Sequence, residues 1–459
     1  MTIDNKTKRL NAVLVSIPLP DISDEEARQS LDELARLVTT LGFDIFGTLM
    51  QRRPALGGST ILGDGKLKEL ARMTGGTGVV PSGATVKKSK AAEKFAENQE
   101  VVVEEINELE DELDERTEKA TAVIFDCEVT PSQLANLQNA TGVEVLDRTG
   151  VIVEIFSRHA KTKEAKLQVE IARLKYLAPR ARETGGDSGD RLGGTSGETS
   201  LELDRRKIRD RISQLKKELE LMSQDQSTKR TLRAEQLCVA LVGYTNAGKS
   251  SLMRALTGSD VLVQDKLFAT LDTTVRSMFP PTVPKILVSD TVGFIKKLPH
   301  DLVASFRSTL DEAKNATLLL FVVDASDETF RSQLQVTKDV LAEIGVESVP
   351  SRLILNKIDR LDAEAIAALK CEFPEAIALS AKDVVDIKKL QITILSIFEH
   401  NMVEKEILIP YEVQGVIGDI RASMRVLTER YDESGVYLLI KSSSESILKL
   451  ESKLKKNHE

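Results

Sequence analysis

The stretch GYTNAGKSS at residues 243–251 constrains the fold of this chain more than any other segment. It stands between the apolar run LCVALV and the helical pattern SSLMRALTG. A strand, a glycine turn and a helix at this spacing form a phosphate-binding loop, because glycines let backbone N–H groups approach phosphate oxygens at the positive end of the helix. The alternative is an ordinary strand–helix turn with a chance lysine. The phosphate-binding interpretation predicts nucleotide contacts from Gly243, Asn246, Ala247, Gly248, Lys249, Ser250 and Ser251.

Two residues of this loop and two of a later motif have predicted roles at the phosphates. Lys249 is expected to reach the β- and γ-phosphates, and the Ser250 hydroxyl to ligate Mg²⁺. The motif SDTVGF ends a predicted strand. There Asp290 can hold Mg²⁺ through water, and the Gly293 N–H can contact the γ-phosphate. A motif of the form DxxG is weak evidence alone. Here it supports a nucleotide site because it follows a phosphate-binding loop.

The segment LFATLDTT at 267–274 is the expected first switch, where a threonine closes over Mg²⁺ when the γ-phosphate is present. We predict Thr270 for this role, with Thr273 and Thr274 as competitors and a turn threonine as the structural alternative. Catalytic roles are therefore expected for Lys249, Thr270 and Gly293. Phe294 stands where Ras-like proteins have the glutamine that orients the attacking water. Because phenylalanine cannot do this, slow intrinsic hydrolysis, raised by a partner, is expected.

The motifs LNKID and LSAK predict that the nucleotide is guanine. The Asn356 side chain can fix the base at O6 and N7, and the stem of Lys357 would lie over its face. Asp359 can accept from N1–H and the 2-amino group together, which adenine cannot offer. The second motif contributes the Ala381 N–H to O6, buttressed by Ser380 and Lys382. GTP or GDP with Mg²⁺ is therefore the predicted ligand.

The composition excludes several other classes of protein. The three cysteines are far apart and lack CxxC spacing, and the four histidines form no metal-ligand spacing, so free thiols and structural histidines are expected. The apolar stretches are too short to span a bilayer, and the N-terminus has no apolar secretory region. A cytoplasmic monomer without an integral membrane segment or a DNA partner is expected, with peripheral membrane association left open.

Charge is distributed unevenly along the chain. Residues 91–120 carry twelve acids and three bases, which accounts for the net charge of −8. By contrast, residues 158–182 have eight Lys or Arg against two acids, and residues 204–217 have seven against two. Basic helices are often only solvated faces. Two of them flanking one glycine-rich loop also suit a polyanionic partner.

The pattern of apolar residues predicts an α/β chain of four parts. Residues 1–157 form an N-terminal α/β domain with an acidic insertion at 81–120, and residues 158–233 an antiparallel helical coiled-coil hairpin. Its second helix carries a 4-3-4-3 apolar seam at Ile208, Ile212, Leu215, Leu219 and Met222. Residues 234–401 alternate strands and helices, as in a doubly wound P-loop GTPase domain. Residues 402–459 form a small α+β domain.

Taken together, the motifs resemble those of HflX-type GTPases. The resemblance includes LGDGKLKEL, VTPSQLANLQ, VEVLDRTGVIVEIFSRHAKTKEAKLQVEIARLKYLAPR, GETSLELDRRKIRDRI, FATLDTT and VSDTVGFIKKLPHDLVASFRSTLDE, and it covers nearly the whole chain except 75–120. Two departures stand out. The acidic insertion is unusual, and the hairpin loop reads GGTSGE at 193–198 where the family has GGxGxRGPGE.

The resemblance implies binding to the large ribosomal subunit, through rRNA contacts of the N-terminal domain and the basic hairpin. It also implies the splitting or rescue of stalled ribosomes, with the hairpin loop pointing toward the peptidyl-transferase centre. A ribosome-assembly GTPase would use the same residues on an immature particle. A non-ribosomal protein-binding switch, acting through the hairpin and the acidic insertion, is the third alternative.

Overall fold

A computed structural model describes residues 10–80, 119–180, 200–233, 236–258, 267–268, 274–297, 312–346, 349–400, 402–411 and 415–456. The described residues within Met1–Arg158 and Val169–Gln214 form one compact unit, and those within His159–Gln168 and Leu215–Glu459 form a second. The acidic insertion, except its last two residues, and the hairpin loop 181–199 lie outside the described residues. The predicted boundaries at 157, 233 and 401 remain a proposal.

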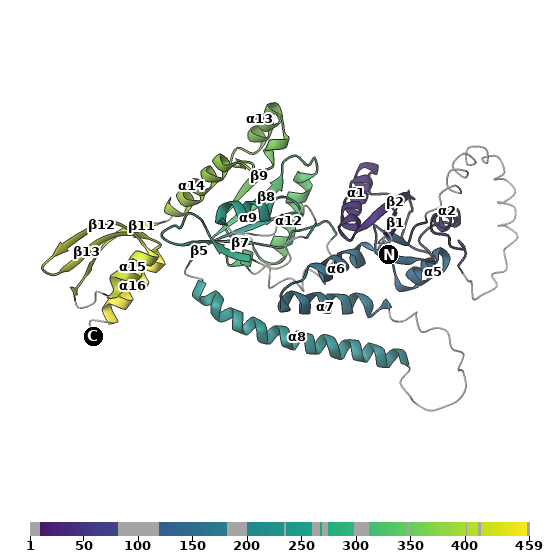
Figure 1. Cartoon of the computed structure of the whole chain (residues 1–459), viewed down its shortest axis with the longest axis horizontal. Coiled ribbons are helices and arrows are strands. Elements are labelled where there is room, and N and C mark those ends of the chain that lie inside the picture. Colours follow the sequence, from purple (N-terminus) through teal and green to yellow (C-terminus); the bar gives the residue numbers. More distant parts are fainter. Residues whose placement is uncertain are drawn as a thin grey trace, which may run out of the picture. The chain divides into compact units, whose positions relative to one another are not determined.

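The first unit contains a four-stranded parallel sheet of order β2-β1-β3-β4. Strands β1 and β2 of this sheet are labelled in Figure 1. Its strands are β1 (Leu10–Ser16), β2 (Phe43–Met50), β3 (Ala122–Phe125) and β4 (Glu144–Asp147). Its helices are α1 (Asp24–Thr40), α2 (Asp64–Thr74), α5 (Pro131–Thr141) and α6 (Arg148–His159). Ser23 and Thr130 begin α1 and α5 with capping boxes, in which the cap hydroxyl accepts from the third helical N–H.

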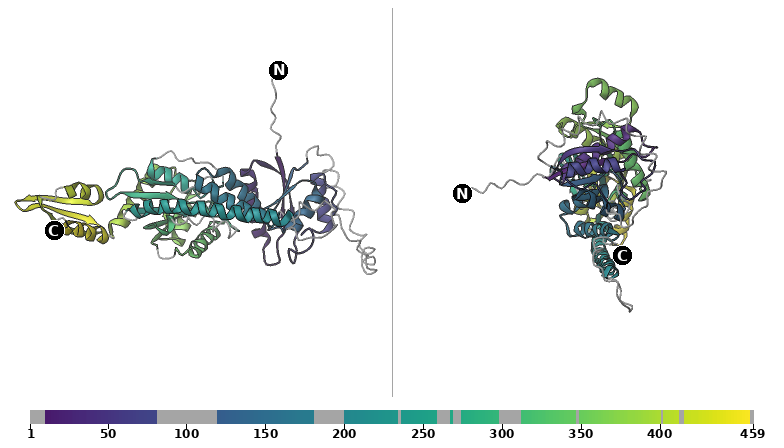
Figure 2. Two further views of the ribbon diagram at one scale, coloured as in Figure 1. Left: turned by 90° about the horizontal axis from the view of Figure 1, so that it is seen from below. Right: turned by 90° about the vertical axis from the view of Figure 1, so that its right-hand side faces the viewer.

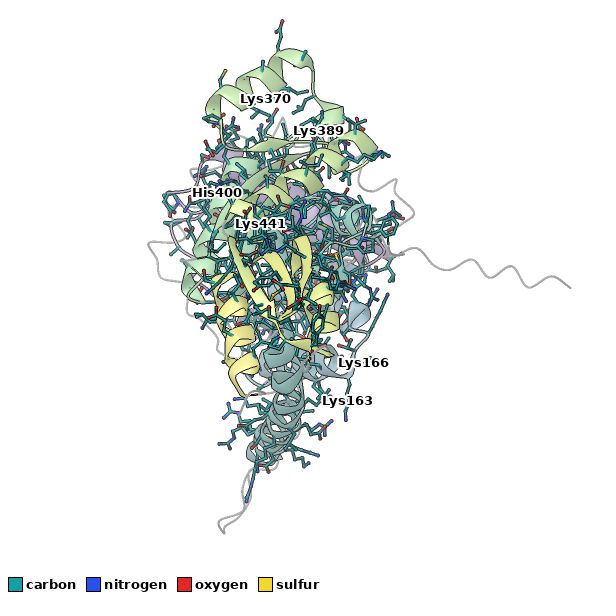
Figure 3. The ribbon with its side chains drawn as sticks, turned by 90° about the vertical axis from the view of Figure 1, so that its left-hand side faces the viewer. Lys163, Lys166, Lys370, Lys389, His400 and Lys441 are labelled. Carbon is teal, nitrogen blue, oxygen red and sulfur yellow. The ribbon has the colours of Figure 1, made fainter. Side chains whose placement is uncertain are left out.

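Two further helices carry the predicted basic stretches. They are α7 (Lys163–Leu177) and α8 (Ser200–Arg233), and α8 is one continuous helix in Figure 2. The seam positions of α8 are buried or half-buried, with Leu215 at 0% exposure, while most of the residues around them are exposed. Arg211 of α8 pairs with Glu170 of α7 at 2.9 Å. Lys163 and Lys166 lie on the exposed side of α7 and are labelled in Figure 3.

The second unit holds a six-stranded sheet of order β10-β9-β8-β5-β7-β6. Its strands are β5 (Leu237–Gly243), β6 (Thr274–Ser277), β7 (Ile286–Asp290), β8 (Leu318–Asp324), β9 (Ser351–Asn356) and β10 (Ile377–Ala378). All neighbours pair in parallel except β6, which runs antiparallel to β7. The helices are α9 (Lys249–Thr257), α12 (Phe330–Glu343), α13 (Ala363–Glu372) and α14 (Val384–His400), with a 3-10 turn at Ile358–Arg360.

The sheet is stabilised by apolar side chains on its central strands. Val239, Leu241, Val288, Leu320 and Ile354 are all fully buried and belong to one core cluster with residues of α9 and α14. Continuous apolar runs are typical of strands that are covered on both faces. The chain therefore has a mixed α/β fold with parallel sheets.

The end of the chain forms a three-stranded antiparallel sheet of order β11-β13-β12. Its elements are β11 (Val403–Ile409), α15 (Gly415–Ser423), β12 (Arg425–Asp432), β13 (Gly435–Ser442) and α16 (Ser444–Lys456). Its core includes Ile409, Ile420, Leu438, Ile440 and Ile447. Among the described residues, no helix has both the length and the apolar character needed to cross a membrane.

Candidate guanine-nucleotide site

Four predicted motifs lie at one edge of the six-stranded sheet. Strands β5, β7, β9 and β10 are parallel, so their carboxyl ends meet at the same edge, where ligands bind in open α/β sheets. The phosphate-binding loop follows β5, the DTVGF segment 290–294 begins at the last residue of β7, and the NKID and SAK motifs follow β9 and β10. The fold therefore brings together residues that are more than a hundred positions apart in sequence.

The backbone of the phosphate-binding loop has the conformation that glycines allow. Gly248 has a φ of +96° and precedes the first residue of α9. A Cβ at this position would lie 2.2 Å from the Asn356 side-chain nitrogen, so no larger residue fits. Asn246 is also left-handed, with a φ of 60°. This turn leaves the amino end of α9 facing the site, where an anion is favoured.

Lys249 begins α9 and is buried, with 6% of its surface exposed. Its Nζ donates to the carbonyl oxygens of Gly243, at 3.0 Å, and Tyr244, at 2.7 Å. Burial lowers the pKa of its ammonium group to about 8, although the nearby Asp290 carboxylate acts to raise it. The lysine is thus held across the phosphate-binding loop, at the place where the motif predicts phosphate.

Ser250 and Asp290 supply the oxygen atoms that the predicted Mg²⁺ site needs. The Ser250 hydroxyl donates to Asp290 Oδ2 at 2.7 Å, and Asp290 is fully buried. A hydroxyl and a carboxylate fit Mg²⁺, which prefers oxygen ligands. In proteins, water and substrate phosphate usually supply several of these ligands. No group of three His, Cys, Asp or Glu side chains that could hold a metal ion occurs in the described part of the chain. Phosphate and water would therefore complete the coordination.

The DTVGF segment is hydrogen-bonded to the phosphate-binding loop. The Phe294 N–H donates to the Gly243 carbonyl oxygen at 3.1 Å, and the Thr245 N–H donates to the Phe294 carbonyl oxygen at 2.8 Å. Phe294 is 2% exposed. Its ring is therefore packed inside the domain and has no polar group with which to orient water.

The Asn356 side chain links two loops of the site. Its Nδ2 donates to the Ala247 carbonyl oxygen at 2.8 Å, and its Oδ1 accepts from the Ala381 N–H at 3.0 Å. The Ala381 N–H, predicted to donate to guanine O6, is thus directed at Asn356 in this structure. The neighbouring Lys357 has a φ of 63°, and its Nζ pairs with Asp324 at 2.7 Å.

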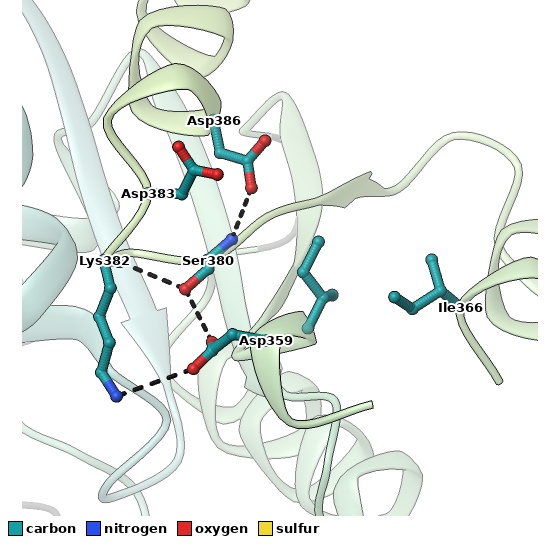
Figure 4. A pocket seen from close by; sticks show the side chains of 7 residues that line it. Asp359, Ile366, Ser380, Lys382, Asp383 and Asp386 are labelled. Atoms are coloured by element: carbon teal, nitrogen blue, oxygen red, sulfur yellow. Dashed lines mark hydrogen bonds and ion pairs between the residues drawn. The ribbon is translucent and has the colours of Figure 1, made fainter. Parts of the chain in front are cut away.

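Asp359 lies beside Ser380 and Lys382, as Figure 4 shows. The Ser380 hydroxyl donates to Asp359 Oδ1 at 2.7 Å, and Lys382 Nζ is 3.7 Å from Oδ2. The Ser380 bond, more than any other cause, lowers the pKa of the Asp359 carboxyl below its usual value. A pocket of about 350 Å³ adjoins this group, lined by Ile358, Asp359, Ile366, Ser380, Lys382, Asp383 and Asp386.

The remaining predicted residues differ in what the structure describes of them, and one contributor was missed. Thr270 and Thr273 lie outside the described residues, while Thr274 begins β6 and pairs with Asp290 across the strands. Ser251 is half-buried in the first turn of α9. Asp324, the partner of Lys357, was not predicted. Its position at the end of the apolar run TLLLFVVD was a usable signal, since that strand ends at the same edge.

A mainly parallel sheet with a phosphate-binding loop and guanine-recognition motifs at the carboxyl ends of its parallel strands defines a P-loop GTPase domain. Models of protein families match three parts of the chain. They are "GTP-binding GTPase N-terminal" at 28–81 and 81–157, "GTP-binding GTPase Middle Region" at 159–233, and "50S ribosome-binding GTPase" at 238–357.

Relatives identify the family. The GTPase HflX of Gluconacetobacter diazotrophicus is 57% identical over 96% of this chain and 97% of its own length. That of Caldanaerobacter subterraneus subsp. tengcongensis is 37% identical over 93% of this chain and 89% of its own. The chain belongs to the HflX family of GTPases, and it hydrolyses GTP.

Solved structures give a weaker likeness. A GTP-binding protein from Sulfolobus solfataricus in complex with GDP is 24% identical, with 84% of this chain and 98% of that chain covered. The TM-score is 0.41, which is too low to support any conclusion about this chain.

Proposed function

We propose that this GTPase is a switch that binds the large ribosomal subunit in its GTP form and leaves after hydrolysis. The observation that carries the proposal is the direct bonding of the DTVGF segment to the phosphate-binding loop. A γ-phosphate bound at this loop would contact Gly293, the residue before Phe294. The nucleotide state can therefore change the position of this segment and the protein surface around it. The family match to a 50S ribosome-binding GTPase over 238–357 supports the choice of partner.

The residues at the sheet edge have distinct proposed roles. Lys249 and the backbone of the phosphate-binding loop hold the β- and γ-phosphates, and the Gly293 N–H contacts the γ-phosphate. Ser250, Asp290 and Thr270 would hold Mg²⁺, which neutralises charge on the phosphates when it is bound. Asp359 reads N1–H and the 2-amino group of guanine, while Asn356 fixes the loops around the base. The buried Phe294 leaves water positioning to the backbone or to a partner.

The proposed ribosome contacts lie in the first unit and along α7 and α8. Arg205, Arg206 and Arg209 follow one another along α8, and Arg206 and Arg209 are exposed. Lys163 and Lys166 are exposed on α7 (Figure 3). Each Lys or Arg that neutralises an rRNA phosphate releases counterions, so affinity for the subunit should fall steeply with salt. From the family resemblance we also propose that the protein splits or rescues stalled ribosomes. We propose further that it acts as a monomer in the cytoplasm.

Cosedimentation tests this proposal against its alternatives. The protein is incubated with a non-hydrolysable GTP analogue or GDP and centrifuged with mature large subunits, with immature particles, or alone. Binding to mature subunits in the GTP form is expected. Preference for immature particles would identify an assembly GTPase instead. Binding to neither would favour a non-ribosomal switch.

A charge-reversal variant tests which surface binds. Replacing Arg205, Arg206 and Arg209 with glutamate should weaken cosedimentation and leave GTP affinity unchanged, because the nucleotide loops lie elsewhere in the chain. The matched control replaces three exposed lysines of the GTPase domain with glutamate, namely Lys314, Lys338 and Lys370. An equal loss in both variants would mean that net charge, and not the α8 surface, sets the affinity.

A further inference from the structure

Asp324 is the last residue of β8, and no role in nucleotide binding is proposed for it above. Its carboxylate is largely buried, with 14% of the side chain exposed. The Oδ2 atom accepts from Lys357 Nζ at 2.7 Å. The Oδ1 atom accepts from the Ser326 N–H at 3.1 Å and from the Ser326 hydroxyl at 2.6 Å. Because both oxygens have partners, the carboxylate is held in the orientation that meets Lys357.

The position of β8 in the sheet places Asp324 between two loops of the nucleotide site. Strand β8 lies between β5, which leads into the phosphate-binding loop, and β9, which leads into the NKID motif. Asp324 is the partner of Asn356 across β8 and β9. The following N–H, that of Ala325, donates to the Asn356 carbonyl oxygen at 2.9 Å. The carboxylate is therefore fixed beside the strand end from which Lys357 emerges.

The Lys357 side chain runs from the NKID motif to the phosphate-binding loop. Its backbone is left-handed, with a φ of 63°, and 16% of its side chain is exposed. A Cβ built on Gly248 would lie 4.0 Å from Lys357 Cε, which is an ordinary van der Waals contact. The far end of the stem thus lies near Gly248, and the ammonium group is bound to Asp324. A lysine whose charged head has a partner can offer its aliphatic stem as an apolar surface.

We infer that Asp324 sets the affinity of this site for guanine nucleotides by holding the Lys357 stem in place before the base arrives. It is a positioning residue, and the inference rests on the base site proposed above beside Asp359. A lysine side chain that becomes ordered only on binding costs conformational entropy, which lowers affinity. The stem that Asp324 already holds does not incur this cost. Because the base is common to GTP and GDP, both nucleotides benefit equally.

The substitution Asp324→Asn tests the inference, because it removes the charge that holds Lys357 and keeps an oxygen for Ser326. Dissociation constants for GDP and for a non-hydrolysable GTP analogue are measured by calorimetry on the full chain. Both affinities should fall by about three- to tenfold, with their ratio unchanged. The control is Glu451→Gln, which neutralises the partner of Lys405 in the C-terminal domain. It should alter neither affinity.

A double-mutant cycle shows whether Asp324 acts through the lysine. Lys357→Met keeps an unbranched apolar stem and removes the ammonium group. In that background, adding Asp324→Asn should change either affinity by less than about twofold. The double variant has neither an unpaired lysine nor an unpaired carboxylate at this place. The comparison between Lys357→Met and the double variant therefore stands even if Asp324→Asn alone folds poorly.

An equal fall in affinity in the wild-type and Lys357→Met backgrounds would overturn the inference, since Asp324 would then act independently of the lysine. Unchanged affinities in Asp324→Asn would also overturn it, as would a fall for only one of the two nucleotides. Failure of the proposed base site is a different result, seen in the wild type itself. That protein would bind ADP as tightly as GDP, and the inference would fall with the site.

Discussion

The Asn356 side-chain nitrogen donates to the Ala247 carbonyl oxygen at 2.8 Å, across 109 residues of sequence. The same side chain accepts from the Ala381 N–H. One amide group therefore joins the phosphate-binding loop to the loop that carries the SAK motif. Because it holds both loops, its loss should weaken every guanine nucleotide alike.

The substitution Asn356→Asp tests this relationship by putting a carboxylate oxygen opposite the Ala247 carbonyl. Losing the donor and leaving a carbonyl unsatisfied costs about 2 kcal/mol, or roughly thirtyfold in affinity. The fall should be equal for GDP and for a GTP analogue, as measured by calorimetry. Asn136→Asp is a matched control, since Asn136 also donates to a carbonyl oxygen, that of Ser59 at 2.9 Å, in the first unit. Unchanged GDP binding in Asn356→Asp would show that the bridge is dispensable.

Asp359 should decide which purine the site accepts. In Asp359→Asn the side chain can no longer accept from both N1–H and the 2-amino group, so GTP should bind more weakly. Xanthosine triphosphate should bind more tightly, because it presents an oxygen where guanine has its amino group. Competition binding with the two nucleotides measures the exchange. Asp362→Asn, at the amino-terminal cap of α13, is the control and should alter neither affinity. Equal losses for the two nucleotides would indicate damage to the fold.

The hydrogen bond from Ser380 to Asp359 should be visible in the titration of Asp359. This bond is the main cause that lowers the pKa of the Asp359 carboxyl below 3.8. A carboxyl whose pKa is lower in the folded than in the unfolded protein contributes stability above the unfolded pKa, and that contribution is lost as pH falls through the folded pKa. In Ser380→Ala the pKa should rise toward 3.8, so the contribution becomes smaller and its loss is complete at a higher pH. Carboxyl-carbon NMR of Asp359 measures both values, and identical titrations would contradict the assignment.

The first unit should depend on the buried Arg148. Its guanidinium donates to Asp126 at 2.7 Å and also pairs with Glu33, and only 3% of its side chain is exposed. Arg148→Met would leave two largely buried carboxylates without this cation, a change that costs about 3–5 kcal/mol. Hydrogen exchange of β3 amides reports the stability of this unit. Arg52→Met is the control, because the exposed pair of Arg52 and Asp24 should contribute nothing measurable. Unchanged protection of β3 in Arg148→Met would refute the prediction.

Much of the fold could be predicted from sequence, because apolar periodicity and caps act locally. The predicted alternation of strands and helices over 234–401 is seen in β5, β7, β8, β9 and β10 with α9, α12, α13 and α14. Thr130, a cap residue type followed by proline, does begin α5. The helix α6 was missed, since its run VIVEIF has the β-branched character of a buried strand. The four residues of β6 were also missed, as they pair antiparallel at the edge of the sheet.

The contacts within the site were harder to predict than the motifs themselves. Lys357 pairs with Asp324, and the Tyr244 hydroxyl oxygen accepts from the Lys296 N–H. Both contacts depend on the strand order β9-β8-β5-β7, which places these loops next to one another. Motif spacing indicates what each loop binds, but it does not indicate which contacts the loops make with one another. The burial of Phe294 likewise follows from its pairing with Gly243 and Thr245, which no local pattern reveals.

The most direct test of a ribosome-linked switch is the rate of GTP hydrolysis by the purified full chain as large ribosomal subunits are added. Because the Phe294 side chain cannot orient the attacking water, the protein alone should turn over slowly. Large subunits should raise kcat, small subunits should not, and the variant with glutamate at 205, 206 and 209 should need more large subunits for the same rate. Rapid hydrolysis by the protein alone, unchanged when large subunits are added, would contradict the proposed function.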